Sequence, residues 1–127
     1  PPSLGLLTIN ALTASHEVLI PVQCEYYALE GLGQLLETLR LVQERLNPQL
    51  FVRGAVLTMY ETKNHLAQSV HQQMYEFFPH AIFRTVIPRS VQLAEAPSFG
   101  QPIHGYASWS VGARAYRRLA REFLQTP

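Results

Sequence analysis

The sequence contains no aspartate, one lysine and one cysteine, and each of these shortages excludes a kind of site. A single cysteine, Cys24, permits neither an internal disulfide nor a cysteine-based zinc site, and it is typical of a reducing compartment. The residues around Lys63 do not match a Gly-x-x-x-x-Gly-Lys-Ser/Thr phosphate loop. The acidic residue that holds Mg²⁺ in enzymes with that loop is usually an aspartate. We therefore assign no catalytic residue to these 127 residues.

Long apolar runs and metal-ligand patterns are also missing. No apolar stretch approaches the roughly 18 residues that span a bilayer, and the first residues lack the positive charge of a signal peptide. The five histidines show no His-x-x-x-His or His-Glu-x-x-His spacing, and there is no Gly-x-Ser-x-Gly turn. We therefore expect a soluble, cytoplasmic protein with no metal site and no hydrolase triad.

The composition is that of one globular unit. Hydrophobic residues make up 47% of the chain and charged residues 15%, which indicates a compact domain or a piece of one. The formal net charge of +1 gives no general attraction to nucleic acid. Any nucleic-acid contact must therefore come from a local basic patch.

Hydrophobic spacing predicts alternating helices and strands. Residues 4–14 are apolar on nearly every side and predict a buried helix, and residues 18–22 predict a strand buried on both faces. The other predicted elements are an amphipathic helix at 29–46, a strand at 52–59, a helix capped by Asn64 and ended before Pro79, a strand at 83–87, a loop with one helical turn at 88–102, and a helix from Val111 to Phe123.

This alternation predicts an α/β fold, with a parallel sheet and right-handed crossover helices. In such folds ligands bind beyond the carboxyl ends of the strands. The loops expected at that edge are 23–29, 60–64 and 88–101.

Four segments resemble the ParA/Soj family of chromosome- and plasmid-partitioning ATPases. They are 1–12, 21–32, Leu-Thr-Met-Tyr at 57–60, and Ile-Pro-Arg-Ser-Val-Gln-Leu-Ala-Glu-Ala-Pro-Ser-Phe-Gly-Gln-Pro at 87–102. They occur in the family's order. The resemblance implies that residues 1–127 are a single partial domain, the carboxy-terminal half of a P-loop NTPase-type doubly wound fold. Pro1 and Pro2 resemble the end of the family's Asp-x-Pro-Pro motif.

The resemblance also implies what the intact protein does. It would bind ATP and Mg²⁺, form a homodimer, bind DNA without sequence preference on the nucleoid, and be stimulated by a ParB-like partner. The 127 residues alone would lack ATPase activity, because the phosphate loop is absent from them.

Three residues are implied at the nucleotide. By resemblance, Met59, Pro88 and Arg89 border the adenine of ATP. The alternative is that Met59 and Pro88 are strand ends that only pack.

A second group is implied at the dimer interface. Glu25, Tyr26 and Tyr27 follow the first strand, and tyrosines supply rigid contact area at interfaces. The alternative is an ordinary helix start, where Glu25 and Glu30 interact favourably with the helix dipole.

Basic residues form two candidate DNA contacts. By resemblance, Lys63 is one, and Gln92 stands where relatives carry arginine, with Arg89 three residues earlier as a possible substitute. Spacing alone places four arginines on one face of the last helix, here called the basic stripe: Arg114, Arg117, Arg118 and Arg121. The alternative is a solvated helix face.

Two rival functions stay open. One is a non-enzymatic DNA- or protein-binding module derived from the same family. The other is a MinD-like protein, which uses a carboxy-terminal amphipathic helix on membranes. The sequence Glu-Ala-Pro-Ser at 95–98 is more similar to Soj, and no additional membrane segment follows residue 121. We therefore expect no membrane partner.

Overall fold

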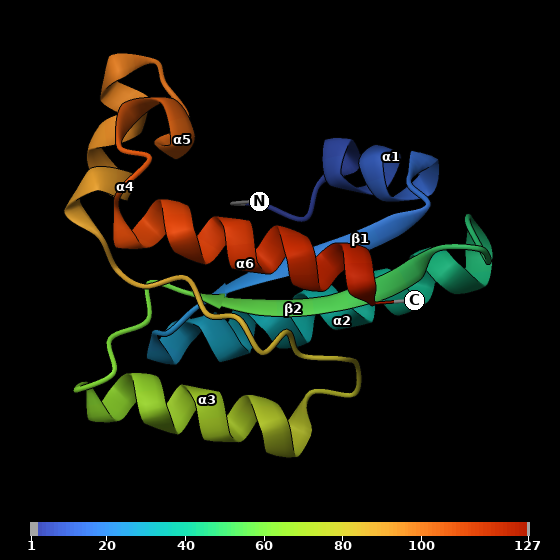
Figure 1. Ribbon diagram of the computed structural model, residues 1–127. Coiled ribbons are helices and arrows are strands. Elements are labelled where there is room, and N and C mark those ends of the chain that lie inside the picture. The colour runs from blue at the N-terminus through green and yellow to red at the C-terminus, as the bar shows by residue number, and fades with distance from the viewer. Residues whose placement is uncertain (1–2, 127) are drawn as a thin grey trace.

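A computed structural model describes residues 3–126, in which two parallel strands are covered by helices on both faces (Figure 1). The strands are β1 (Glu17–Gln23) and β2 (Phe51–Thr58). The helices are α1 (Leu6–Ala14), α2 (Tyr26–Arg45), α3 (His65–Phe77), α4 (Val91–Glu95), the 3-10 turn η1 (Ala96–Phe99), α5 (Ile103–Tyr106) and α6 (Val111–Gln125). The predicted α/β class with a parallel sheet is confirmed. Pro1 and Pro2 lie outside the described residues.

β2 is the strand around which the core forms. Leu57 belongs to a buried cluster with Leu39 of α2 and Met74 of α3. The preceding residue, Val56, belongs to a second cluster with Leu119 of α6. Successive strand residues point to opposite faces, so α2 and α3 cover one face and α6 covers the other (Figure 1).

The long helices confirm the periodicity predictions. The helix expected at 29–46 is α2, which begins three residues earlier and ends before the Asn47-Pro48 pair. Asn64 caps α3 as predicted, because its side-chain oxygen accepts a hydrogen bond from the amide of Leu66 at 2.8 Å. Ser110 caps α6 in the same way.

The third predicted strand, 83–87, forms only in part. Instead of a continuous ladder, one isolated bridge flanks the segment at each end: Ile82 pairs with Ala55 of β2, and Pro88 pairs with Tyr60 just beyond β2. Between those bridges, the amides of Arg84 and Thr85 donate to the carboxylate of Glu122 in α6, at 2.6 and 2.9 Å. The prediction of a full strand was wrong because a side chain far along the chain takes these two amides.

Two predictions of complete burial were also wrong. Only Leu12 of α1 is buried, whereas Leu6 and Leu7 are largely exposed. In β1 Ile20 and Val22 are buried, but the residues between and beside them are exposed. Within residues 3–126, no strand pairs with the outer edge of β1, and Leu19 and Pro21, which alternate with the buried Ile20 and Val22, are exposed.

A bulge makes Arg53 an extra residue in β2. Val18 pairs with Val52, but the next residue, Leu19, pairs with Gly54. Bulges of this kind re-aim a side chain. Gly54 itself has a φ of 149°, and a Cβ there would lie 2.7 Å from the carbonyl oxygen of Ala81.

The re-aimed Arg53 holds the carboxyl end of α6. Its guanidinium donates to the carbonyl of Phe123 at 2.6 Å and to that of Thr126, and lies 4.5 Å over the Phe123 ring. It also pairs with Glu17 of β1 at 3.3 Å. The last carbonyls of a helix have no hydrogen-bond donors within the helix. Arg53 provides donors for two carbonyls at the end of α6.

We expect Gly54→Ala to lower the free energy of unfolding by about 2 kcal/mol, through an unfavourable φ and a clash with backbone. Chemical denaturation of both chains would measure the difference. Gly31→Ala is the matched control, since Gly31 is an exposed α2 residue and a Cβ added there would meet no neighbouring atom within 4 Å. That change should stabilise by about 0.5–1 kcal/mol. Equal effects at the two glycines would contradict the explanation.

We expect Glu122→Gln to destabilise the fold by about 1 kcal/mol at neutral pH, because it removes an ionised acceptor from two amides. Burial raises the pKa of Glu122, but hydrogen bonds from Thr85 and Arg84 outweigh it and leave the pKa below its usual range. A lowered pKa stabilises the fold above the unfolded value of about 4.3, and this contribution disappears as the pH falls through the folded value.

Denaturation curves of wild type and Glu122→Gln should therefore converge as the pH falls below about 4. Glu30→Gln, at an exposed α2 position, is the control and should show no such convergence. A difference that is independent of pH would show that the carboxylate charge is not involved.

Candidate functional site

Three loops meet at the carboxyl edge of the strands, as predicted. The amide of Cys24, after β1, donates to the carbonyl of Thr58 at the end of β2, at 3.1 Å. The amide of Tyr60, after β2, donates to the carbonyl of Ile87 at 3.0 Å, and that of Arg89 donates back to Tyr60 at 3.1 Å. Backbone hydrogen bonds therefore hold the three loops together.

Arg89 adds an ionic connection between the same loops. Its Nε lies 3.1 Å from Oε1 of Glu61, and one terminal nitrogen lies 3.7 Å from Oε1 of Glu25. We call this arrangement the Arg89 bridge: Glu25, Arg89 and Glu61. Sequence reasoning missed this pairing, although all three residues lie in the loops that were expected at this edge.

A hollow of about 360 Å³ lies at this edge, here called the edge hollow. Its lining is Cys24, Glu25, Tyr26, Tyr27, Met59, Glu61, Asn64, Leu66 and Arg89. The structure thus brings together Met59 and Arg89, predicted at the nucleotide, and the three residues predicted at the dimer interface. Pro88, the other predicted nucleotide residue, adjoins it through its bridge to Tyr60.

The chemistry of the edge hollow suits an uncharged aromatic group better than a phosphate. Its one cationic side chain, Arg89, is already paired with two carboxylates. The other walls are tyrosine, methionine and leucine side chains with a few polar atoms. Flat apolar surfaces with a small number of hydrogen-bonding groups are typical of pockets for organic ligands.

Met59 has an unusual backbone. Its φ is 52°, the only positive φ at a residue other than glycine within 3–126, and the residue is 40% exposed. Such a conformation is unfavourable for a side-chain-bearing residue and is found preferentially at functional sites. The turn it creates lets Tyr60 pair with the segment at 87–89.

The two tyrosines are presented to solvent. The rings of Tyr26 and Tyr27 meet edge to face with centroids 5.6 Å apart, and the residues are 71% and 78% exposed. Glu25 precedes them at the N-cap position of α2, but its side chain makes no capping hydrogen bond. Instead its carboxylate faces Arg89.

Cys24 forms the inner wall of the edge hollow and is buried. Burial raises the pKa of its thiol to about 11. The group therefore remains a neutral thiol at physiological pH, which does not suit a nucleophile.

The predicted DNA-binding residues lie on separate elements. Lys63 is exposed in the loop between β2 and α3. In the basic stripe, Arg114, Arg118 and Arg121 are exposed and have no carboxylate of residues 3–126 within ion-pair distance. Arg117 is half-buried and donates to the carbonyl of Ser108 at 3.0 Å.

Gln92 stands at the position where, by resemblance, relatives carry arginine. It lies in α4 and accepts a hydrogen bond from the hydroxyl of Ser90 at 3.0 Å. Arg89, the possible substitute, is engaged by the two carboxylates of the bridge. Its charge is therefore less available to a phosphate than that of an unpaired arginine.

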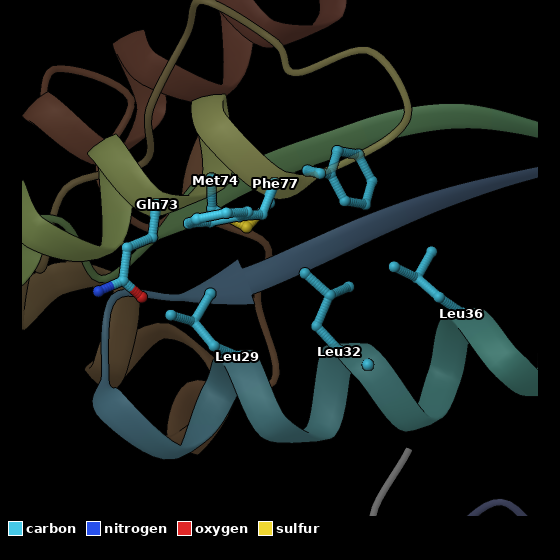
Figure 2. A pocket seen from close by; sticks show the side chains of 8 residues that line it. Leu29, Leu32, Leu36, Gln73, Met74 and Phe77 are labelled. Carbon is cyan, nitrogen blue, oxygen red and sulfur yellow. The ribbon is translucent and has the colours of Figure 1, made fainter.

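Sequence reasoning also missed an apolar hollow of about 230 Å³ between α2 and α3. Figure 2 shows side chains from both helices pointing into the space between them. The labelled residues are Leu29, Leu32 and Leu36 of α2 and Gln73, Met74 and Phe77 of α3. The pair Phe77-Phe78, at the end of the predicted helix, could have indicated an apolar surface there.

Metal ligands and membrane helices are not seen in the described part of the chain. Across residues 3–126, no three histidine, cysteine or acidic side chains gather closely enough to hold an ion. None of the helices in that range has the length and apolarity needed to cross a bilayer.

Comparison with known proteins gives consistent matches. Residues 1–52 match the family model described as an AAA domain. The chain is 57% identical to the sporulation initiation inhibitor protein Soj of Bacillus subtilis, over 96% of this chain and 48% of that protein. It is 52% identical to the chromosome-partitioning ATPase Soj of Treponema pallidum, over 98% of this chain and 49% of that protein.

The chain belongs to the ParA/Soj family. It spans about half the length of the curated ParA/Soj relatives it matches. Among solved structures, it is similar to cobyrinic acid a,c-diamide synthase from Mycobacterium smegmatis with bound ATP analog and magnesium. That match has a TM-score of 0.78 and 36% identity, and covers 98% of this chain and 45% of the other. The predicted membership of the ParA/Soj family is thus confirmed.

Proposed function

We propose that these residues are the carboxy-terminal half of a ParA/Soj-type ATPase domain, whose intact protein binds ATP and Mg²⁺ and acts in chromosome or plasmid partitioning. The observation that carries the proposal is the edge hollow, which gathers Met59 and Arg89 at the carboxyl ends of the strands. Support also comes from relatives named as chromosome-partitioning proteins and from a similar structure with an ATP analog and magnesium.

The chemistry of the edge hollow defines which part of the nucleotide it would contact. A paired arginine and apolar walls fit the adenine, bordered by Met59, Pro88 and Arg89. The phosphates and Mg²⁺ would be held by a glycine- and lysine-containing loop and an acidic residue outside this sequence. ATP hydrolysis is therefore a property of the intact protein, and residues 1–127 alone are expected to lack it.

The exposed surfaces would serve partners of the intact protein. Tyr26 and Tyr27, beside Glu25, would contact a second copy in a nucleotide-dependent homodimer. Lys63 and the basic stripe would contact DNA phosphates, with Arg89 and Gln92 at the edge of that surface. A ParB-like partner would stimulate hydrolysis, and the protein would act in the cytoplasm on the nucleoid.

The rival proposal is a non-enzymatic binding module. Arg114, Arg118 and Arg121 of α6 favour it, because no carboxylate of residues 3–126 pairs with them and their charges are available to nucleic acid without any nucleotide. The two functions differ in one property: a module binds DNA equally well with and without ATP, whereas a ParA/Soj-type ATPase binds DNA in response to ATP.

We expect Met59→Ala in the full-length protein to raise the dissociation constant for ATP several-fold, because it removes a side chain that borders the base. Loss of about 1 kcal/mol of contact corresponds to roughly fivefold. Calorimetric titration with a non-hydrolysed ATP analogue would measure the change. Leu124→Ala is the control, since Leu124 is an exposed apolar residue at the far end of α6. If Met59→Ala binds the ATP analogue as tightly as wild type, the adenine does not lie at this edge.

We expect Lys63→Glu, and separately a triple Arg114→Glu, Arg118→Glu and Arg121→Glu variant, to weaken DNA binding by the full-length protein. Each lost phosphate contact should reduce the slope of log affinity against log salt by about one. Fluorescence anisotropy at several salt concentrations, with and without ATP, would measure both quantities.

Arg40→Glu is the matched charge reversal, because Arg40 lies on α2 and is paired with Glu37 and Glu44. DNA affinity that falls equally in this control would indicate a general charge effect. Strong DNA binding by wild type that is independent of ATP would favour the non-enzymatic module.

A further inference from the structure

Arg89 contacts all three edge loops at once. Its backbone amide donates to the carbonyl of Tyr60, and its Nε pairs with Glu61, so two contacts reach the loop after β2. One terminal nitrogen pairs with Glu25, in the loop after β1. Arg89 itself belongs to the third loop. A guanidinium presents donors in a fixed fork, and here different nitrogens of the fork serve two carboxylates.

Folding stability does not explain this arrangement. The side chains of Arg89, Glu25 and Glu61 are 52%, 55% and 47% exposed. Ion pairs between such exposed groups contribute little to the free energy of folding, because water and salt screen them. Without Arg89, moreover, two carboxylates would face each other across the edge hollow. The bridge therefore determines where the loops lie more than whether the chain folds.

The position of Glu25 connects the Arg89 bridge to the exposed tyrosines. It immediately precedes Tyr26 and Tyr27, and among residues 3–126 its carboxylate has no ion-pair partner other than Arg89. At the other end of the bridge, Glu61 follows Tyr60, whose amide and carbonyl hold the segment at 87–89. The bridge thus joins the exposed tyrosine pair to the edge where Met59 and Pro88 lie.

We propose that Arg89 is a positioning residue that couples nucleotide at the edge hollow to the docking of a second copy of this chain on the Tyr26–Tyr27 surface. The inference rests on the proposed function. A nucleotide against Pro88 and Arg89 fixes the position of their segment, and the bridge passes that constraint to Glu25 and the adjacent tyrosines. Nucleotide and partner therefore each increase the affinity of the protein for the other.

The test uses the full-length protein. Sedimentation equilibrium with and without a non-hydrolysed ATP analogue gives the gain in dimer affinity caused by nucleotide, and calorimetric titration gives nucleotide affinity. We expect Arg89→Gln to unfold within a few degrees of wild type and to lose roughly fivefold or more of that gain. Arg89→Lys, which has one nitrogen in place of the fork, should lose part of it. Arg45→Gln, at an exposed position in α2, should keep all of it.

A double-mutant cycle makes the assignment specific. Glu25→Gln alone should reduce the gain, and adding it to Arg89→Gln should cause little further loss, because the two residues act through one contact. If the losses of dimer gain add up in the double variant, Glu25 and Arg89 do not act through one contact, and the proposed role of the Arg89 bridge is wrong.

The remaining outcomes separate the two proposals. If wild type binds nucleotide and dimerises in response to it while Arg89→Gln shows the same gain, the positioning role is wrong and the proposed function stands. Because Arg89 also borders the proposed adenine site, the gain is compared at saturating analogue: a gain that Arg89→Gln fully recovers at saturation would show that Arg89 acts only as a nucleotide ligand, which overturns the positioning role. If wild type shows no nucleotide-dependent dimer, the proposed function fails and this inference fails with it.

Discussion

Burial of β2 on both faces is the constraint on which the rest of the structure depends. Neighbouring residues of this strand enter two different clusters, one with α2 and α3 and one with α6. One side of β2 carries β1, and the other carries the interrupted segment at 82–88. Because every layer is attached to this one strand, its end determines where the edge loops converge. The edge hollow is thus a product of the core.

The features that sequence could predict are those fixed by near neighbours in the chain. Apolar spacing predicted α2, α3 and α6, and Asn64 predicted the start of α3, because helices form through contacts three and four residues apart. The interrupted strand could not be predicted, since Glu122 takes its amides from a helix nearly 40 residues later. Composition likewise showed that α1 is apolar but not which of its faces has a partner.

The candidate site shows the same division. The general rule for parallel sheets placed three loops at one edge, and the resemblance to ParA/Soj proteins assigned residues to them. The structure then showed that residues predicted for two different tasks line one hollow. The Arg89 bridge depends on the relative position of loops whose residues are more than 60 positions apart, as for Glu25 and Arg89, and local pattern carries no information on such a pairing.

Cys24, in the wall of the edge hollow, offers a way to follow the opening of the three edge loops. Cys24 is 5% exposed, and a pKa of about 11 keeps the reactive thiolate scarce at neutral pH. A thiol reagent can modify it only when the three loops separate, so the rate of alkylation reports how often this edge opens. Since Cys24 is the one sulfhydryl in these 127 residues, that rate would come from a single, known position.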